Sequence, residues 1–415
     1  MKQSLGHRVS SIVMLAVLTG CFLFSGVNPD RAEAEETVNI AFVLGLTGPY
    51  STYGVPLKDA MNLALKEVNE DGGFVVNGKK YKLNVIYYDH ASKPEVEAPG
   101  LLKKAIYSDK VPILFVGGST LTRMAIPFLH QGKTPTVVIL ASILGVTQKS
   151  PYIFRIRPDA AQVSPPLAAY FTGNGKKRLA CVGADNDFSR DCMEVWKKVS
   201  QERGGEILAE EYFSPGKVQD FYPILSKIKS LNPDAVFVGG FTQEAALVYK
   251  QAYEVGIKAP LGGYNGMTPE QAKDLIGVKY NDVLKNVLDA RGIDPINHPK
   301  KHVRDWAVAF KKKFGYTPAD LTMWAWDAVF LAVETFQKAG TVSDREKIRK
   351  AMADLDMGAT KKCLTPYVSM EGNKLFDKTG QAFSTTVVLG WGDKEWQPVA
   401  YYATVGDKIN EIKFD

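Results

Sequence analysis

The sequence predicts an α/β protein made of two similar Rossmann-like lobes, each built around a parallel sheet. Three observations support this prediction. From Val38 onward, short β-branched runs alternate with amphipathic helical windows, which is typical of parallel βαβ units. The segment 176–207 repeats the strand, polar loop and helix that begin at Val38. A chain of 415 residues with 45% hydrophobic composition is also long enough to bury two cores.

The N-terminal segment 1–34 predicts an export signal. It starts with basic residues, continues with the apolar run 10–27 and ends with the small-x-small pattern Ala-Glu-Ala at 32–34, which suits cleavage. The run contains Leu-Thr-Gly-Cys, so lipidation at Cys21 is an alternative to cleavage. Its length is at the short end for a membrane span, which leaves an anchor as a further alternative. We expect an exported, periplasmic protein, with the soluble form ahead of the lipoprotein.

Eight apolar, β-branched runs predict the strands of the two sheets, at 38–46, 81–89, 112–118, 135–142, 177–185, 206–213, 234–241 and 259–266. Helical windows fall between them, for example at 57–70, 189–203 and 244–255. The pair Asn77 and Gly78 predicts a hairpin turn before the second run. Prolines and polar residues accumulate at 154–166, where we expect the chain to change domain.

The loops that follow these strands are rich in glycine, hydroxyl and single aromatic residues and poor in charge. In parallel sheets, ligands bind outside the carboxyl ends of the strands. The first loop, 45–54, opens onto a helix, whose N-terminus offers backbone N–H groups to an anion or a polar group. No G-x-G-x-x-G and no phosphate-loop motif follows this strand, so we expect no dinucleotide and no other cofactor.

The strand ends favour a binding protein over an enzyme. The loops at 45–54, 116–122, 140–145, 183–189, 239–244 and 262–266 carry no histidine, no cysteine and no G-x-S-x-G elbow, so a nucleophile beside a base is missing from them. His298 and His302 have a zinc-like spacing, but no cysteine or second histidine pair accompanies them. We interpret that segment as a solvated turn and expect no metal site.

The charge of the chain indicates which partners to expect, and its cysteines indicate whether to expect a disulfide. The formal net charge is +6, and the basic residues are interspersed with acidic ones, so we expect no nucleic-acid partner. Cys181, Cys192 and Cys363 are the cysteines that follow the export signal. Cys181 and Cys192 could form a disulfide, and buried free thiols are the equally acceptable alternative.

Several blocks resemble one known family. They are GLTGPYSTYG at 45–54 with DAMNLALKEVNEDGG at 59–73, YYDHASKPEVE at 87–97, SPYIFRIRPDAAQ at 150–162 and GNKLFDKTGQ at 372–381. In this order, and over most of the chain from Val38 to Pro398, the blocks resemble the type I periplasmic solute-binding proteins of ABC transporters, in the group that binds branched-chain amino acids and amides. Each block alone would be weak.

The resemblance implies a fold and a function. The chain would cross between two lobes three times, with lobe one at 37–158 and 291–378 and lobe two at 159–290 and 379–415. The protein would capture a hydrophobic amino acid, or a related small carboxylate or amide, by closing the hinge. As a monomer, it would deliver this ligand to an inner-membrane ABC permease. A ligand sensor of the same fold is the alternative.

The resemblance also implies site residues in lobe one. In the family, hydroxyl and backbone N–H groups of this lobe bind the ligand carboxylate, and these positions correspond here to Ser119, Thr120, Ser142 and the backbone of Ala141. Several neutral donors can stabilise a carboxylate without an ion pair. Tyr53 would line the cleft. The alternative for Ser119 and Thr120 is that they cap the helix that follows.

Lobe two departs from the family pattern. Phe188 and Phe241 stand where amino-acid binders often have tyrosine, with core packing as the alternative. Tyr264 and Asn265 stand where these binders commonly place an acid for the ligand ammonium. A buried ammonium without a carboxylate is costly, so the ligand need not carry one, and an aromatic carboxylate is the alternative ligand. Asp187 could supply the charge, but we expect it to cap a helix.

Overall fold

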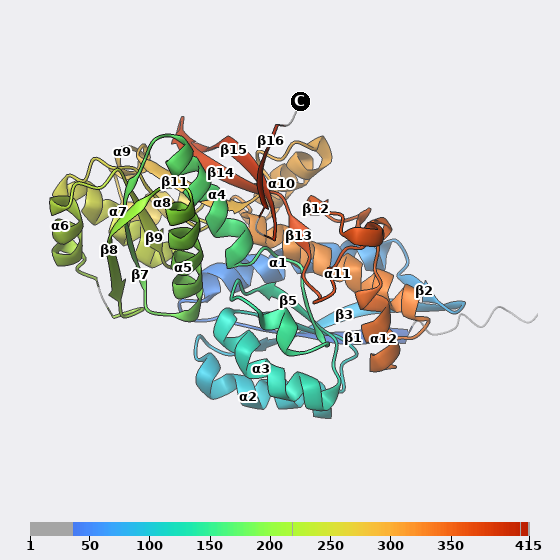
Figure 1. Cartoon of the computed structure of the whole chain (residues 1–415). Helices are drawn as coiled ribbons and strands as arrows, with labels where there is room; N and C mark the ends of the chain where they lie inside the picture. The colour runs from blue at the N-terminus through green and yellow to red at the C-terminus, as the bar shows by residue number, and fades with distance from the viewer. Residues whose placement is uncertain (1–35, 218, 407, 414–415) are drawn as a thin grey trace, which may run out of the picture. The chain divides into compact units, whose positions relative to one another are not determined.

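The computed structural model describes residues 36–217, 219–406 and 408–413, so the predicted export signal and Cys21 lie outside the described residues. Within those ranges, none of the helices combines the length and the hydrophobicity that a membrane crossing requires. The described chain forms two large sheets covered by helices on both faces (Figure 1). This arrangement confirms the predicted α/β fold with two parallel-sheet lobes.

The first sheet has six strands in the order β2-β3-β1-β4-β5-β6. Their bounds are β1 Glu36–Leu44, β2 Phe74–Val76, β3 Lys79–Asp89, β4 Leu114–Gly117, β5 Thr136–Leu140 and β6 Ile153–Arg155. All neighbours are parallel except β2 and β3. These two join through Asn77 (φ 49°) and Gly78 (φ 79°), which confirms the predicted hairpin turn.

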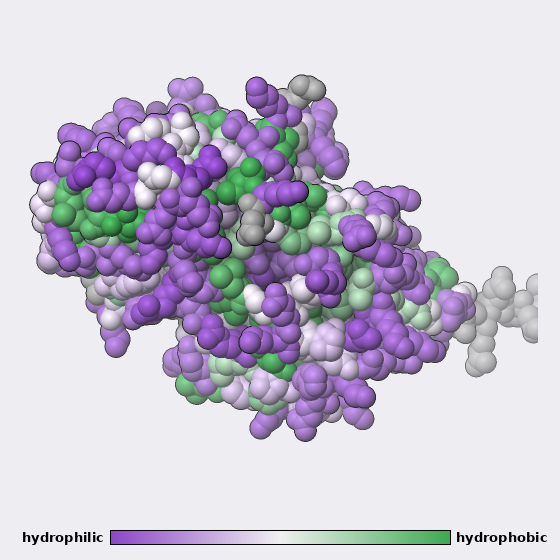
Figure 2. Space-filling model, in the orientation of Figure 1, coloured by the Kyte–Doolittle hydropathy of each residue, from purple (hydrophilic) through white to green (hydrophobic). Residues whose placement is uncertain are grey.

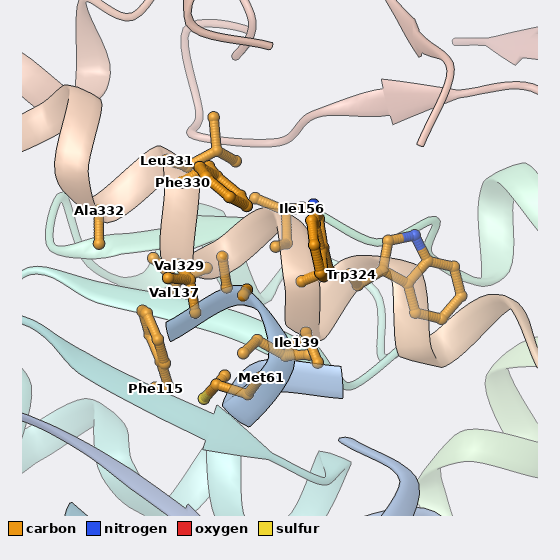
Figure 3. Close-up of a cluster of buried hydrophobic side chains, with 14 of the residues drawn as sticks. Met61, Phe115, Val137, Ile139, Ile156, Trp324, Val329, Phe330, Leu331 and Ala332 are labelled. Carbon is orange, nitrogen blue, oxygen red and sulfur yellow. The ribbon is translucent and has the colours of Figure 1, made fainter. Parts of the chain in front are cut away.

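Both faces of the first sheet are buried, because side chains alternate along each strand. In β1, Ile40 and Phe42 face one core while Ala41 and Val43 face the other. The first core contains α1 Ser51–Glu70, α10 Lys301–Phe314, α11 Asp320–Ala339 and α12 Arg345–Ala353. The second contains α2 Pro94–Lys103 and α3 Ser119–Gly132. Figure 3 shows Met61 of α1, Phe115 of β4 and Trp324 of α11 in the first core.

The second sheet has eight strands in the order β16-β15-β14-β11-β10-β9-β7-β8. Their bounds are β7 Arg178–Ala184, β8 Glu206–Phe213, β9 Ala235–Gly239, β10 Leu261–Gly263, β11 Val287–Gly292, β14 Thr386–Gly392, β15 Glu395–Val405 and β16 Lys408–Ile412. The strands from β7 to β11 are parallel, and β14, β15 and β16 extend the sheet antiparallel. The eight predicted strands lie in the two sheets, and β11 and the antiparallel strands were not predicted.

Helices also cover both faces of the second sheet. In β7, Ala180 and Val182 face the core that contains α6 Tyr222–Ser230, α7 Thr242–Val255, α8 Pro269–Ile276 and α9 Tyr280–Leu284. Leu179 and Cys181 face the core of α4 Ala160–Gly173 and α5 Asp187–Glu202. Cys181 and Cys192 lie as free thiols in the core of α4 and α5, and Cys363 is a buried free thiol in the first core of the first sheet.

The chain passes between the sheets more than once. It leaves the first sheet after β6, enters α4, and returns from β11 to α10. It then passes through the small pair β12 Tyr367–Val368 and β13 Phe383–Ser384 into β14. One visible face is mostly hydrophilic, and its hydrophobic residues gather in small separate areas (Figure 2).

The interpretation of His298 as part of a solvated turn is wrong. His298 is fully buried, its Nδ1 accepts a hydrogen bond from the Lys300 backbone N–H (3.1 Å), and its backbone carbonyl accepts one from Arg304 Nη1 (2.5 Å). Burial lowers the pKa of His298 to about 4, so the ring is neutral at pH 7. No metal-binding group of three His, Cys, Asp or Glu side chains is present among the described residues.

Candidate ligand-binding site

A cavity lies at the carboxyl ends of strands from both sheets. Its wall includes residues that follow β1, β3, β4, β6, β9 and β10, the end of β5, and the first turns of α1, α3, α5 and α11. The empty volume, open solvent included, is about 1020 Å³. This is the place where parallel sheets bind ligands.

Most of the predicted site residues line this cavity, namely Tyr53, Ser119, Thr120, Phe188, Phe241, Tyr264 and Asn265. Ala141 and Ser142 are buried and are not part of the wall. The Ser142 hydroxyl donates to the Pro158 carbonyl (3.2 Å), and the Ala141 carbonyl lies 3.4 Å from Arg155 Nη1. The structure therefore places Ala141 and Ser142 behind the cavity wall rather than in it.

The N-terminus of α3 forms one polar part of the wall. The helix begins at Ser119, and its N-cap Gly118 (φ 127°) has no side chain to accept a hydrogen bond from the first turn. The alternative that Ser119 and Thr120 cap a helix starting at Leu121 is thus wrong, because both lie inside the helix. The first-turn N–H groups have no intrahelical acceptor, so this end of the cavity suits an anion or a carbonyl oxygen.

Aromatic rings form much of the opposite wall. Phe188 and Phe241 are stacked, with ring centroids 5.7 Å apart and an interplanar angle of 4°. Phe241 also contacts Tyr50 and Tyr53 edge-on, at 5.7 and 5.8 Å, and Phe188 contacts Tyr264 at 6.0 Å. These faces offer apolar area and π surface to a ligand.

Tyr53 connects the two lobes across the cavity. Its hydroxyl accepts a hydrogen bond from the Thr242 backbone N–H (2.8 Å) and shares another with the Thr242 hydroxyl (3.0 Å). Burial raises the pKa of Tyr53 to about 12, so the hydroxyl is neutral. A second connection joins Arg123 of α3 and Asp187 of α5, whose Nη2 and Oδ1 atoms are 3.1 Å apart. The N-cap of α5 is Asn186, so Asp187 does not cap this helix.

Arg157 is a cavity residue that the sequence analysis did not predict. It is 95% buried and its Nη2 donates to the Tyr264 hydroxyl (2.5 Å). Its guanidinium carbon lies 5.4 Å from the Tyr264 ring centre and 4.9 Å from that of Trp324. Trp324 packs in the first core and also lines the cavity.

Asn265 has little free hydrogen-bonding capacity. Its side-chain oxygen accepts from the Tyr249 hydroxyl (2.5 Å), and its side-chain nitrogen donates to the Gly240 carbonyl (2.8 Å). Its backbone N–H donates to Asp289 Oδ1 (3.1 Å). Asn265 therefore shapes the loop after β10 more than it offers polar groups to a ligand.

Two other titratable residues in the wall were not predicted. Asp320 Oδ2 accepts from the Gly292 N–H (2.9 Å) and Oδ1 from the Leu321 N–H (2.8 Å). Burial raises the pKa of Asp320 to about 6, against the opposing effect of nearby positive charge. His90 is buried beside Tyr50, and burial lowers the pKa of its imidazole, which is neutral at pH 7.

The missed residues lie at different kinds of position. Arg157 follows β6, where the chain leaves the first sheet, and Asp320 and Trp324 lie in the first turns of α11, a helix of the first core. His90 directly follows β3, a strand end whose loop was not considered. The i and i+4 spacing of Asp320 and Trp324 was the available sign that they share one helix face. Nothing in the sequence showed that this face borders the cavity.

Comparison with known proteins identifies a family and relatives that this chain resembles over most of its length. Residues 37–394 match the model of the family described as periplasmic binding protein. The Leu/Ile/Val-binding protein BraC3 of Rhizobium johnstonii is 25% identical over 357 residues, which cover 85% of this chain and 91% of that protein.

Two solved structures have a similar fold. One is a solute-binding protein of an ABC transporter from Rhodopseudomonas palustris in complex with 3,4-dihydroxybenzoic acid, with a TM-score of 0.75, 24% identity, and coverage of 90% of this chain and 99% of that chain. The other is the branched-chain amino acid transporter substrate-binding protein LivJ from Streptococcus pneumoniae in complex with isoleucine, with a TM-score of 0.74, 20% identity, and coverage of 91% and 100%.

Proposed function

Since this chain belongs to the family of periplasmic binding proteins, whose members bind solutes without catalysis, we propose that it is the substrate-binding component of an ABC importer. It captures a hydrophobic amino acid or a related small carboxylate or amide in the periplasm. It then presents this ligand, as a monomer, to an inner-membrane permease. The predicted export signal favours transport over the alternative function of a ligand sensor. A transport protein predicts permease and ATPase genes beside its own gene, whereas a sensor predicts none there.

The observation that carries this proposal is a cavity whose wall comes from both lobes and is closed by contacts between them. Tyr53 of α1 and Thr242 of α7 are hydrogen-bonded across it, and Arg123 and Asp187 pair nearby. A site built in this way is complete only when the lobes are together. Hinge closure around a ligand is the mechanism that such a site supports.

The ligand class follows from the two kinds of wall. The N-terminus of α3, with Ser119 and Thr120, provides donors for a carboxylate or carbonyl oxygen. Phe188 and Phe241 provide apolar area, and burying an aliphatic or aromatic group contributes about 1.5 to 3 kcal/mol. A small carboxylate with an apolar body satisfies both.

Two classes of ligand fit the cavity, and different observations favour each class. A branched-chain amino acid is the leading ligand, supported by the names of the relatives, and two acids in the wall, Asp320 and Asp187, could pair with its ammonium. Asp187 already pairs with Arg123, so Asp320 is the better candidate. An aromatic carboxylate is supported by the aromatic wall and by similar structures that contain benzoate-type acids. Both Asp320 oxygens already accept backbone hydrogen bonds, which weakens the first case.

Calorimetry with leucine, 4-methylpentanoate and benzoate, after a thermal-shift screen of metabolites, separates these cases. A loss of more than about 100-fold from leucine to 4-methylpentanoate, near 2.7 kcal/mol, indicates an ammonium site. Asp320→Asn should then remove the preference. Equal or tighter binding of the two acids favours the carboxylate without an ammonium. A protein that no amino acid and no carboxylate stabilises would contradict the proposed function.

A further inference from the structure

Arg157 differs from the other buried arginines in its charge balance. Arg155 Nη2 lies 2.7 Å from Asp159 Oδ2. Arg291 lies between two carboxylates, at 3.2 Å from Asp289 and 3.7 Å from Asp294. Arg157 has no carboxylate oxygen within 4.0 Å in the described part of the chain. It is also the one of these three arginines that lines the cavity.

The contacts of Arg157 are all neutral. Nη2 donates to the Tyr264 hydroxyl, and the rings of Tyr264 and Trp324 lie beside the guanidinium. Nε is buried without a hydrogen-bond partner among the described residues. Aromatic faces attract a cation, but a buried charge without a counter-ion still costs several kcal/mol. The ligand-free site therefore has an unpaired positive charge at its wall.

Neighbouring acids do not remove this charge. Burial raises the pKa of Asp320 despite the positive charges of Arg291 and Arg157, and its two oxygens already bind the backbone N–H groups of Gly292 and Leu321. Asp159 directs its Oδ2 to Arg155. The missing anion has to come from the solvent side, and the cavity is the side on which Arg157 is accessible.

We propose that Arg157, together with the Tyr264 hydroxyl, is an anion-binding subsite of this cavity and selects a ligand with a carboxylate over the corresponding amide. This inference rests on the proposed function, since it assumes that the cavity binds a small organic ligand. Guanidinium and carboxylate match in geometry and form strong charge-assisted hydrogen bonds. A neutral amide offers one acceptor oxygen and leaves the charge unpaired.

Arg157→Met tests the subsite, with Arg155→Met as the matched control. Methionine keeps the length and apolar stem but removes the charge. Calorimetry uses two acid and amide pairs, benzoate with benzamide and 4-methylpentanoate with 4-methylpentanamide. The wild type should bind the acid of at least one pair about 10- to 100-fold tighter than its amide, and Arg157→Met should lose this preference.

Thermal melting without ligand provides a readout that does not depend on the choice of ligand. Arg157→Met should melt at or above the wild-type temperature, because it removes an unpaired charge. Arg155→Met should melt lower, because it leaves Asp159, Gln381 and the Ile143 carbonyl without their donor.

Three results would overturn the subsite. They are acid and amide binding equally to the wild type, an acid preference that survives in Arg157→Met, and destabilisation of Arg157→Met equal to that of Arg155→Met. In each case carboxylate binding to the wild type would still support the proposed function. If neither acid nor amide of either pair nor leucine bound the wild type, the proposed function itself would fail.

Discussion

Replacing Tyr53 with phenylalanine tests whether contacts across the cavity stabilise the ligand-bound form. The Tyr53 hydroxyl accepts a hydrogen bond from the Thr242 N–H and shares another with the Thr242 hydroxyl. Phenylalanine removes both and leaves a buried N–H without an acceptor. The Thr242 hydroxyl keeps its bond to the Asn265 carbonyl (2.7 Å), so only the contacts between the lobes are lost.

The size of the effect follows from these contacts. A neutral hydrogen bond contributes about 0.5 to 1.5 kcal/mol, and a buried donor left unpaired costs about 1 to 3 kcal/mol. With the lobes apart, water would satisfy the same groups, so the loss applies to the closed form alone. We expect Tyr53→Phe to weaken ligand affinity by about 5- to 150-fold, which corresponds to about 1 to 3 kcal/mol.

Calorimetry with the ligand found in the thermal-shift screen measures this loss. Tyr87→Phe is the matched control, because the Tyr87 hydroxyl donates to Asn62 Oδ1 (2.8 Å) within the first lobe. Its affinity should stay close to that of the wild type. Unchanged affinity in Tyr53→Phe, or the same loss in both variants, would refute the role of the contact between lobes.

Three further predictions concern other residues. Ser119→Ala should weaken ligand affinity about tenfold or more, because a hydrogen bond to a charged group contributes about 1.5 to 3 kcal/mol. Ser142→Ala should bind the ligand like the wild type, because Ser142 lies behind the cavity wall. Equal losses of affinity in both variants, measured by calorimetry, would contradict this prediction. Burial raises the pKa of Asp320 to about 6 from 3.8, so the folded state holds this proton longer than the unfolded state and the group lowers stability as pH rises from about 4 to 6. The free energy of unfolding of Asp320→Asn and of the wild type can be measured by denaturation at pH 4 and pH 7. From pH 4 to pH 7, the stability of the variant relative to the wild type should increase by a difference on the order of 3 kcal/mol, and a relative stability that does not depend on pH would contradict the prediction. Burial raises the pKa of Cys181 and Cys192 to about 12, so thiol reagents should label them only after unfolding, and rapid labelling of the folded protein would be evidence against this.

The fold could be predicted where strands are buried on both faces. Runs such as 38–46 and 234–241 are apolar or β-branched over most of their length and became β1 and β9. Strands β15 and β16 were missed because they lie near the edge of the sheet, where exposed and buried residues alternate and charged residues are common. A search for buried apolar runs does not detect such strands.

The site could be predicted only at the ends of strands. Ser119, Phe241 and Tyr264 lie within two residues of the ends of β4, β9 and β10, and the topology brings these ends together. Ser142 follows β5, but there Leu140 lines the cavity and Ser142 turns to the segment after β6. The direction of each side chain in such a loop depends on tertiary packing, which no local pattern specifies.

The resemblance to the family identifies the protein class better than the ligand. The block at 372–381 is a turn in which Asp377 accepts from the Thr379 and Gln381 N–H groups, while Gln381 accepts from Arg155 Nε (2.5 Å). These contacts fix the turn against β6 of the first sheet, and none of these residues lines the cavity. Arg157 lies two residues from Arg155 in another such block, yet it faces the cavity instead. Two proteins of similar fold contain isoleucine and dihydroxybenzoate, which share a carboxylate and differ in the ammonium. Arg157 and Tyr264 can serve the carboxylate of either ligand, so the test of an ammonium site at Asp320 is the one that distinguishes them.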